Sequence, residues 1–131
     1  MNQDNLATAA IRRYFDALLA GDWNALADTI AESHRFEDRR LGLKFTLDKA
    51  GNIEQAHVIH DFGSSTIDFD LLETRGDRFA LVRQTFHSDF AVTSLGVCEV
   101  DEAARIVRYV IFDEDDIETA RTTLDAVAKT T

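Results

Sequence analysis

The sequence predicts an α+β fold, in which helices come first and a curved antiparallel sheet follows. Two N-terminal segments carry apolar residues at helical spacing, the segment from residue 66 onward changes to a period of two, and the last segment returns to helical spacing. A helix with one apolar stripe cannot bury that stripe alone, so these helices need the sheet as a packing surface. A sheet that curls further than one helix can fill leaves a pocket, and we expect a cone with an open mouth.

The chain has the size and composition of one domain. It contains 131 residues, of which none is Pro and six are Gly, so a disordered linker is not expected. We therefore treat residues 1–131 as a single domain.

The first helix is expected over residues 5–20. Asn5 or its neighbour Asp4 can cap its start, and Gly21 suits the left-handed position after its end. Asp22 can then cap a second, shorter helix. The apolar stripe of the first helix consists of Ile11, Tyr14, Phe15, Leu18 and Leu19, and that of the second consists of Trp23, Leu26, Ala27 and Ile30.

The strands follow these two helices. Residues 33–40 alternate and place His34, Phe36 and Asp38 on one face, and Asn52 can cap a helix that continues to residue 62. Four further strands joined by short turns predict an antiparallel meander. These strands begin at residue 66 and continue through residues 78–89, 92–100 and 105–112, and an acidic cluster at residues 113–116 begins the closing helix.

Composition excludes several classes of function. The formal net charge of −10 repels a phosphate backbone, so nucleic acid is not an expected partner. No window approaches the roughly 18 apolar residues of a membrane span, and no signal peptide is visible, so we expect a cytoplasmic protein without membrane contact. Cys98 is the single cysteine and no ligands stand at zinc spacing, so we expect neither a metal nor a cofactor.

The order and spacing of three segments resemble the nuclear transport factor 2-like superfamily and, within it, the SnoaL-like group. The segments are RRYFDALLAGDWNALADTI…FEDRR, RGDRFALVR and RIVRYVIFDEDD. The resemblance implies a cone of helices packed on a strongly curved sheet. Because the superfamily includes ketosteroid isomerases, limonene-epoxide hydrolases, polyketide cyclases and non-catalytic binding modules, it indicates the fold better than the function.

The resemblance also suggests catalytic positions. Tyr14 and Asp38 match the oxyanion donor and the base of ketosteroid isomerase, whose second acid would fall near Gly96 in this chain. Arg83 matches the Arg of the Asp–Arg–Asp set of the epoxide hydrolases, but the late-strand acid of that set, and of the cyclases, aligns with Val110. The ketosteroid isomerase site is therefore half present, and the other two are incomplete.

Histidines supply further candidates. His87 shares a strand face with Arg83 and Thr85, which the family topology would turn inward, where an imidazole could act as acid or base. His57 and His60 lie three residues apart on one helix face, close enough to touch. Pocket-wall positions are therefore predicted at Phe36, His57, His60, Arg83, Gly96 and Val110, and catalytic ones at Tyr14, Asp38 and His87.

Each candidate also has a purely structural interpretation. Asp38 can pair with Arg39, Arg40 or Arg83 to hold the strand end, and Tyr14 can be a core residue with an incidental hydrogen bond. A histidine such as His87 can lie on the rim or the surface.

Three functions therefore stay open. The first is proton transfer next to a carbonyl group, with Asp38 as the base and Tyr14 as the hydrogen-bond donor to the enolate. The second is a non-catalytic module that binds an apolar small molecule or mediates dimerisation, and the third is epoxide hydration. A homodimer that forms through the outer face of the sheet is expected from the resemblance.

Overall fold

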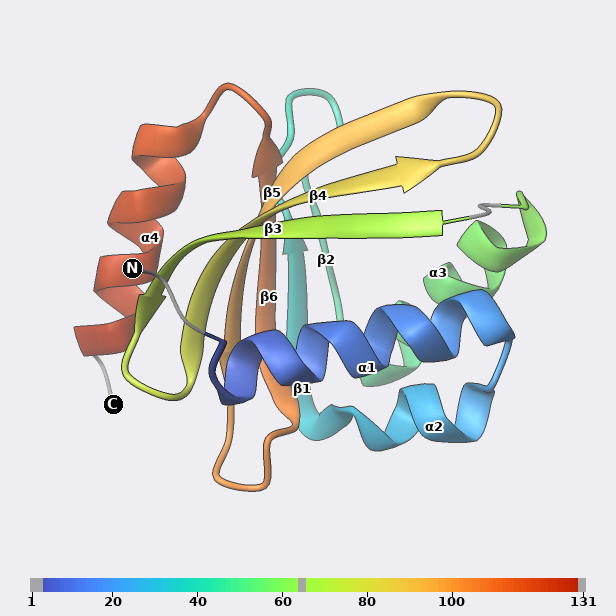
Figure 1. Cartoon of the computed structure of the whole chain (residues 1–131), viewed down its shortest axis with the longest axis horizontal. Helices are drawn as coiled ribbons and strands as arrows, with labels where there is room; N and C mark the ends of the chain where they lie inside the picture. Colours follow the sequence, from blue (N-terminus) through green and yellow to red (C-terminus); the bar gives the residue numbers. More distant parts are fainter. Residues whose placement is uncertain (1–3, 64–65, 130–131) are drawn as a thin grey trace.

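The computed structural model describes residues 4–63 and 66–129. Helices and a six-stranded sheet form the predicted α+β cone, with α1 lying across one face of the curved sheet and α4 on the other (Figure 1). The elements in chain order are α1 (Leu6–Ala20), α2 (Trp23–Asp28), β1 (Ile30–Asp38), β2 (Phe45–Leu47), α3 (Lys49–Asp61), β3 (Thr66–Arg75), β4 (Phe79–His87), β5 (Ala91–Val100), β6 (Ile106–Asp113) and α4 (Ile117–Lys129).

The caps of the first two helices confirm the sequence prediction. The Asn5 side chain accepts a hydrogen bond from the backbone N–H of Thr8, and Gly21 ends α1 with a φ angle of 69°. The Asp22 side chain accepts from the N–H of Ala25 at the start of α2. Ile30 was predicted on the second helix and is instead the first residue of β1, because α2 is only 6 residues long.

The sheet has the order β2-β1-β6-β5-β4-β3. Strands β3 to β6 form the predicted antiparallel meander, and β1 joins its end by pairing in parallel with β6. The short strand β2 lies at the edge and was not predicted from the sequence. The cap of α3 was also wrong: Asp48 caps a helix that begins at Lys49, so Asn52 lies inside the helix.

Apolar side chains cover both faces of the sheet. The concave face packs against α1 through Ala80, Val82 and Cys98, whereas the convex face packs against α4 through Leu81, Val97 and other buried residues. Burial on both faces explains why these strands read as nearly continuous apolar runs. α1 and α3 stand over the concave face and enclose the cavity described below.

In the described ranges 4–63 and 66–129, no helix is both long enough and apolar enough to cross a membrane.

Candidate functional site

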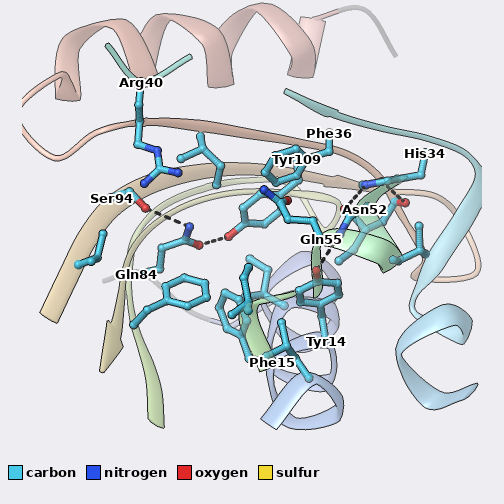
Figure 2. Close-up of a pocket in the computed structure, with 18 of the residues that line it drawn as sticks. Tyr14, Phe15, His34, Phe36, Arg40, Asn52, Gln55, Gln84, Ser94 and Tyr109 are labelled. Atoms are coloured by element: carbon cyan, nitrogen blue, oxygen red, sulfur yellow. Dashed lines mark hydrogen bonds between the residues drawn. The ribbon is translucent and has the colours of Figure 1, made fainter. Parts of the chain in front are cut away.

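A cavity of about 270 Å³ lies between the concave face of the sheet and helices α1 and α3. Most of its wall is apolar, and aromatic rings converge on it from α1, β1, β4 and β6 (Figure 2). The polar side chains of the wall are two hydrogen-bonded groups together with Arg40, Gln55 and Ser88. The apolar wall includes Ile11, Phe15, Leu18, Phe36, Phe86 and Ile111, and the polar wall includes Tyr14, His34, Arg40, Asn52, Gln84, Ser94 and Tyr109.

The first polar group joins α1, α3 and β1. Asn52 Nδ2 donates to the Tyr14 hydroxyl oxygen at 2.8 Å, and Asn52 Oδ1 lies 2.7 Å from His34 Nε2. The other ring nitrogen of His34, Nδ1, lies 3.1 Å from the Ile106 carbonyl oxygen. Burial raises the pKa of Tyr14 to about 12, although the bond with Asn52 opposes this rise. Tyr14 is therefore a neutral phenol at physiological pH.

The second polar group lies on strands β4, β5 and β6. The Tyr109 hydroxyl donates to Gln84 Oε1, and Gln84 Nε2 donates to Ser94 Oγ at 3.1 Å (Figure 2). Burial raises the pKa of Tyr109 well above its ordinary value, so this phenol also stays protonated. The group presents hydroxyl and amide atoms to the cavity but no charge.

Gly96 makes room for the second group. A Cβ atom at this position would lie 2.5 Å from the Tyr109 hydroxyl oxygen and 2.8 Å from two ring carbons of Tyr109. The position at which the family resemblance placed a second acid is therefore occupied by a phenol from the neighbouring strand. Gly96 itself is not among the residues that line the cavity.

Asp38 is buried but does not line the cavity. Its carboxylate accepts hydrogen bonds from the Arg40 backbone N–H at 3.0 Å and from Arg40 Nη2 at 2.7 Å. Arg40, in contrast, lines the cavity (Figure 2). This is the structural alternative considered above, in which an arginine holds Asp38 at the strand end, and the structure does not bring Asp38 and Tyr14 together around one space.

The predicted orientation of β4 was wrong. Gln84, Phe86 and the following Ser88 line the cavity, so Arg83 and His87 point to the convex face. There Arg83 Nε lies 4.0 Å from Glu114 Oε2, and His87 Nε2 lies 2.9 Å from Asp68 Oδ2. Side chains alternate between the two faces along a strand, so one wrong choice of face misplaces every side chain of β4.

Val110 was also predicted in the pocket wall, and this prediction was wrong too. It is fully buried in the cluster beneath α4, on the face opposite the cavity. Phe36 and Tyr14, by contrast, lie in the wall as expected.

His57 and His60 pack outside the cavity, against Trp23. The His57 ring stacks on the indole with centroids 3.7 Å apart, and His60 Nδ1 bonds the Leu18 carbonyl oxygen at 2.9 Å. Both histidines therefore hold α2 and α3 against α1. Across residues 4–63 and 66–129, no three His, Cys, Asp or Glu side chains gather in a way that could hold a metal ion.

Four wall residues were not predicted from the sequence: Asn52, Gln84, Ser94 and Tyr109. Asn52 resembled a helix cap, and Gln84 alternates correctly with Phe86 but was assigned to the other face. Tyr109 belongs to a run of apolar strand residues. Only the alternation in residues 78–89 could have indicated a wall residue, because it places Gln84 on the same strand face as Phe86.

Solved structures with the same architecture come from several sources. A protein of unknown function from Cytophaga hutchinsonii, described as NTF2-like, has a TM-score of 0.62 at 7% identity, covering 90% of this chain and 97% of that one. A proposed polyketide cyclase from Sinorhizobium meliloti has a TM-score of 0.60 at 26% identity, covering 79% and 93%. The chain has the nuclear transport factor 2-like fold.

Other solved structures with this fold carry other names. A proposed ketosteroid isomerase from Kribbella flavida has a TM-score of 0.60 at 19% identity, covering 79% of this chain and 74% of that one. No protein-family model and no curated protein matches the sequence. Because neighbours of one fold carry different names, the nuclear transport factor 2-like fold leaves the function to be argued from the cavity.

Proposed function

We propose that this nuclear transport factor 2-like protein binds a small, mainly apolar molecule that carries oxygen atoms, and that it does so without chemistry at Asp38. The observation that supports this proposal is the make-up of the wall. An apolar cavity of about 270 Å³ carries two separate hydrogen-bonding groups, and no Asp or Glu is among the described residues that line it. Ligand pockets typically combine apolar walls with a few placed polar groups.

The wall defines the chemistry of the ligand. The rings of Phe15, Phe36 and Phe86 favour a flat or aromatic body, which they can contact edge-on or face-on. Tyr14 on one side and the Gln84–Ser94 pair on the other can each hydrogen-bond a carbonyl or hydroxyl oxygen. Burying such an oxygen without a partner costs free energy, so the ligand is expected to carry oxygen where these groups lie.

Proton transfer by Asp38 is the less well supported function. A general base must come within about 2.6–3.2 Å of the proton that it removes. The Asp38 carboxylate has no exposed surface, and Arg40 Nε and Nη2 both donate to it. The reaction would require Arg40 to release Asp38 and to move out of the wall. The names of the neighbouring proposed isomerase and cyclase support the class of ligand more than this mechanism.

Ligand binding can be tested with 1-acetonaphthone, which has a flat aromatic body and one carbonyl oxygen. At a concentration of about 100 times its Kd, it should stabilise the protein by about 2.7 kcal/mol and raise the Tm by about 10 °C. Gln55→Trp, which adds an indole to the wall from α3, should abolish the shift. Glu54→Trp is the matched control, because it adds the same indole on the exposed side of α3.

The same ligand distinguishes binding from catalysis. Its methyl protons lie next to the carbonyl group and exchange for deuterium if a base removes them. We expect binding with exchange at the buffer rate. Faster exchange that Asp38→Asn abolishes would favour the isomerase-like reaction instead, and an equal Tm shift for Gln55→Trp and Glu54→Trp would place the ligand outside the cavity. Dimerisation through the outer sheet face stays a prediction.

A further inference from the structure

The hydrogen bonds of His34 link its protonation to the orientation of the Asn52 carboxamide. Nδ1 faces the Ile106 carbonyl oxygen at 3.1 Å, and Nε2 faces Asn52 Oδ1 at 2.7 Å. Both oxygens can only accept, so both ring nitrogens must carry a proton, and the ring in this arrangement is an imidazolium. Asn52 Nδ2 donates to the Tyr14 oxygen at 2.8 Å. The hydroxyl proton of Tyr14 is then available to a ligand in the cavity.

A neutral His34 reverses the chain of bonds. If Nδ1 keeps its proton for the Ile106 carbonyl oxygen, Nε2 becomes an acceptor and requires the amide nitrogen of Asn52. The Asn52 carboxamide must then flip about its Cβ–Cγ bond, which places Oδ1 against the Tyr14 hydroxyl. Tyr14 now donates to Asn52 and offers only lone pairs to the cavity. The other neutral tautomer would set the Nδ1 lone pair against the Ile106 carbonyl oxygen.

We infer that Asn52 is a specificity-determining residue, which sets whether Tyr14 meets a ligand as donor or acceptor according to the protonation of His34. The inference rests on the proposed ligand-binding function and refines it. With His34 protonated, Tyr14 donates and the cavity admits a carbonyl oxygen as well as a hydroxyl group. With His34 neutral, Tyr14 accepts and the cavity selects a hydroxyl group.

The surroundings of His34 bear on both states. Its side chain and that of Asn52 are buried, with 4% and 3% of the residue surface exposed. Burial lowers the pKa of His34, while the bonds to Asn52 and Ile106 raise it. Among charged groups, Lys49 on α3 lowers this pKa, and its ammonium group is paired with Glu32 at 2.9 Å. The titratable groups Tyr14 on α1 and Tyr109 on β6 line the same cavity as His34. Helix α2 contributes no residue to the described cavity wall.

The coupling between His34 protonation and ligand binding is reciprocal. A ketone that accepts from Tyr14 favours protonated His34, so it must bind more tightly as the pH falls through the His34 titration and must take up a proton on binding. The corresponding alcohol can accept from Tyr14 in one state and donate to it in the other. Its affinity should therefore change little with pH.

The ligand-free protein tests the switch directly. The chain has two tyrosines, so labelling Tyr Cζ with carbon-13 gives two NMR signals, which Tyr14→Phe assigns. The Tyr14 signal should inflect at the pH at which the His34 ring titrates, and the Tyr109 signal, whose hydroxyl donates to Gln84, should not. The test uses the wild-type protein between about pH 4 and pH 8, where a histidine titrates. Each of three results would overturn the inference. They are a Tyr14 chemical shift that stays constant across that titration, an equal inflection at Tyr109, and a His34 that does not titrate in this range.

A matched pair of ligands tests the selectivity. The ratio of the Kd of 1-acetonaphthone to that of 1-(1-naphthyl)ethanol should fall by about fivefold as His34 becomes protonated, the value of one net hydrogen bond. Tyr14→Phe should make this ratio independent of pH. Binding of both ligands with a constant ratio in the wild type would overturn the inference and leave the proposed function intact. Binding of neither would reject the proposed ligand class, and the carbon-13 measurement would still decide the inference.

Discussion

Replacing Asp38 by Asn separates the structural role of this residue from the catalytic one. The Asp38 carboxylate is completely buried, and the Arg40 guanidinium that binds it is 26% exposed. Removing one partner of a buried ion pair costs about 3–5 kcal/mol, and the partial exposure of Arg40 reduces this to about 2–3 kcal/mol. Unfolding entropy is about 0.28 kcal/mol/K for a chain of this length, so the Tm should fall by about 7–11 °C.

Differential scanning calorimetry at neutral pH measures this loss. The control is Asp68→Asn, because that carboxylate is 73% exposed and pairs with His87 on the convex face, so its removal should shift the Tm by less than about 2 °C. If Asp38 were a base free to act on a ligand, its amide would cost activity but no stability. A Tm of Asp38→Asn within about 2 °C of wild type would therefore refute the ion-pair interpretation.

Two further outcomes follow from the cavity wall. Gly96→Ala should cost about 1–3 kcal/mol in urea denaturation, because its Cβ collides with Tyr109. In a Tyr109→Leu background the same change should become neutral or stabilising by about 0.5–1 kcal/mol, since Ala is favoured over Gly in a strand. An equal cost in both backgrounds would contradict the packing argument. The free energy of unfolding should rise with pH up to about pH 6.5. The reason is that His34 has a lowered pKa in the folded protein, so over this range it is neutral when folded but protonated when unfolded. His34→Gln should flatten this slope, and identical slopes in the two proteins would show that His34 does not cause it.

Local chemistry made much of the fold predictable. Asn5, Gly21 and Asp22 cap helix ends in ways that depend on a few neighbouring residues, and each cap was predicted correctly. The meander of β3 to β6 was equally legible, because short turns between alternating runs leave few other topologies. The edge strand β2 was missed, because a strand of 3 residues is too short to show an alternating pattern.

The candidate site shows the limit of sequence patterns. Alternation along β4 correctly separated Gln84 and Phe86 from Arg83 and His87, but it could not say which set faces the cavity. Helices cover both faces of the sheet, so both faces carry apolar side chains and neither is marked as the interior. The choice between them depends on where α1 and α4 pack.

The sequence by itself therefore determined the α+β class, the caps of the first two helices and the antiparallel meander. Tertiary structure alone decided that Asn52 lies between Tyr14 and His34, which are 38 and 18 residues away from it in the chain. The physical reason is range. Caps and alternation arise from neighbours in the chain, whereas the hydrogen-bond partners of a buried polar group come from whichever segments folding brings to it.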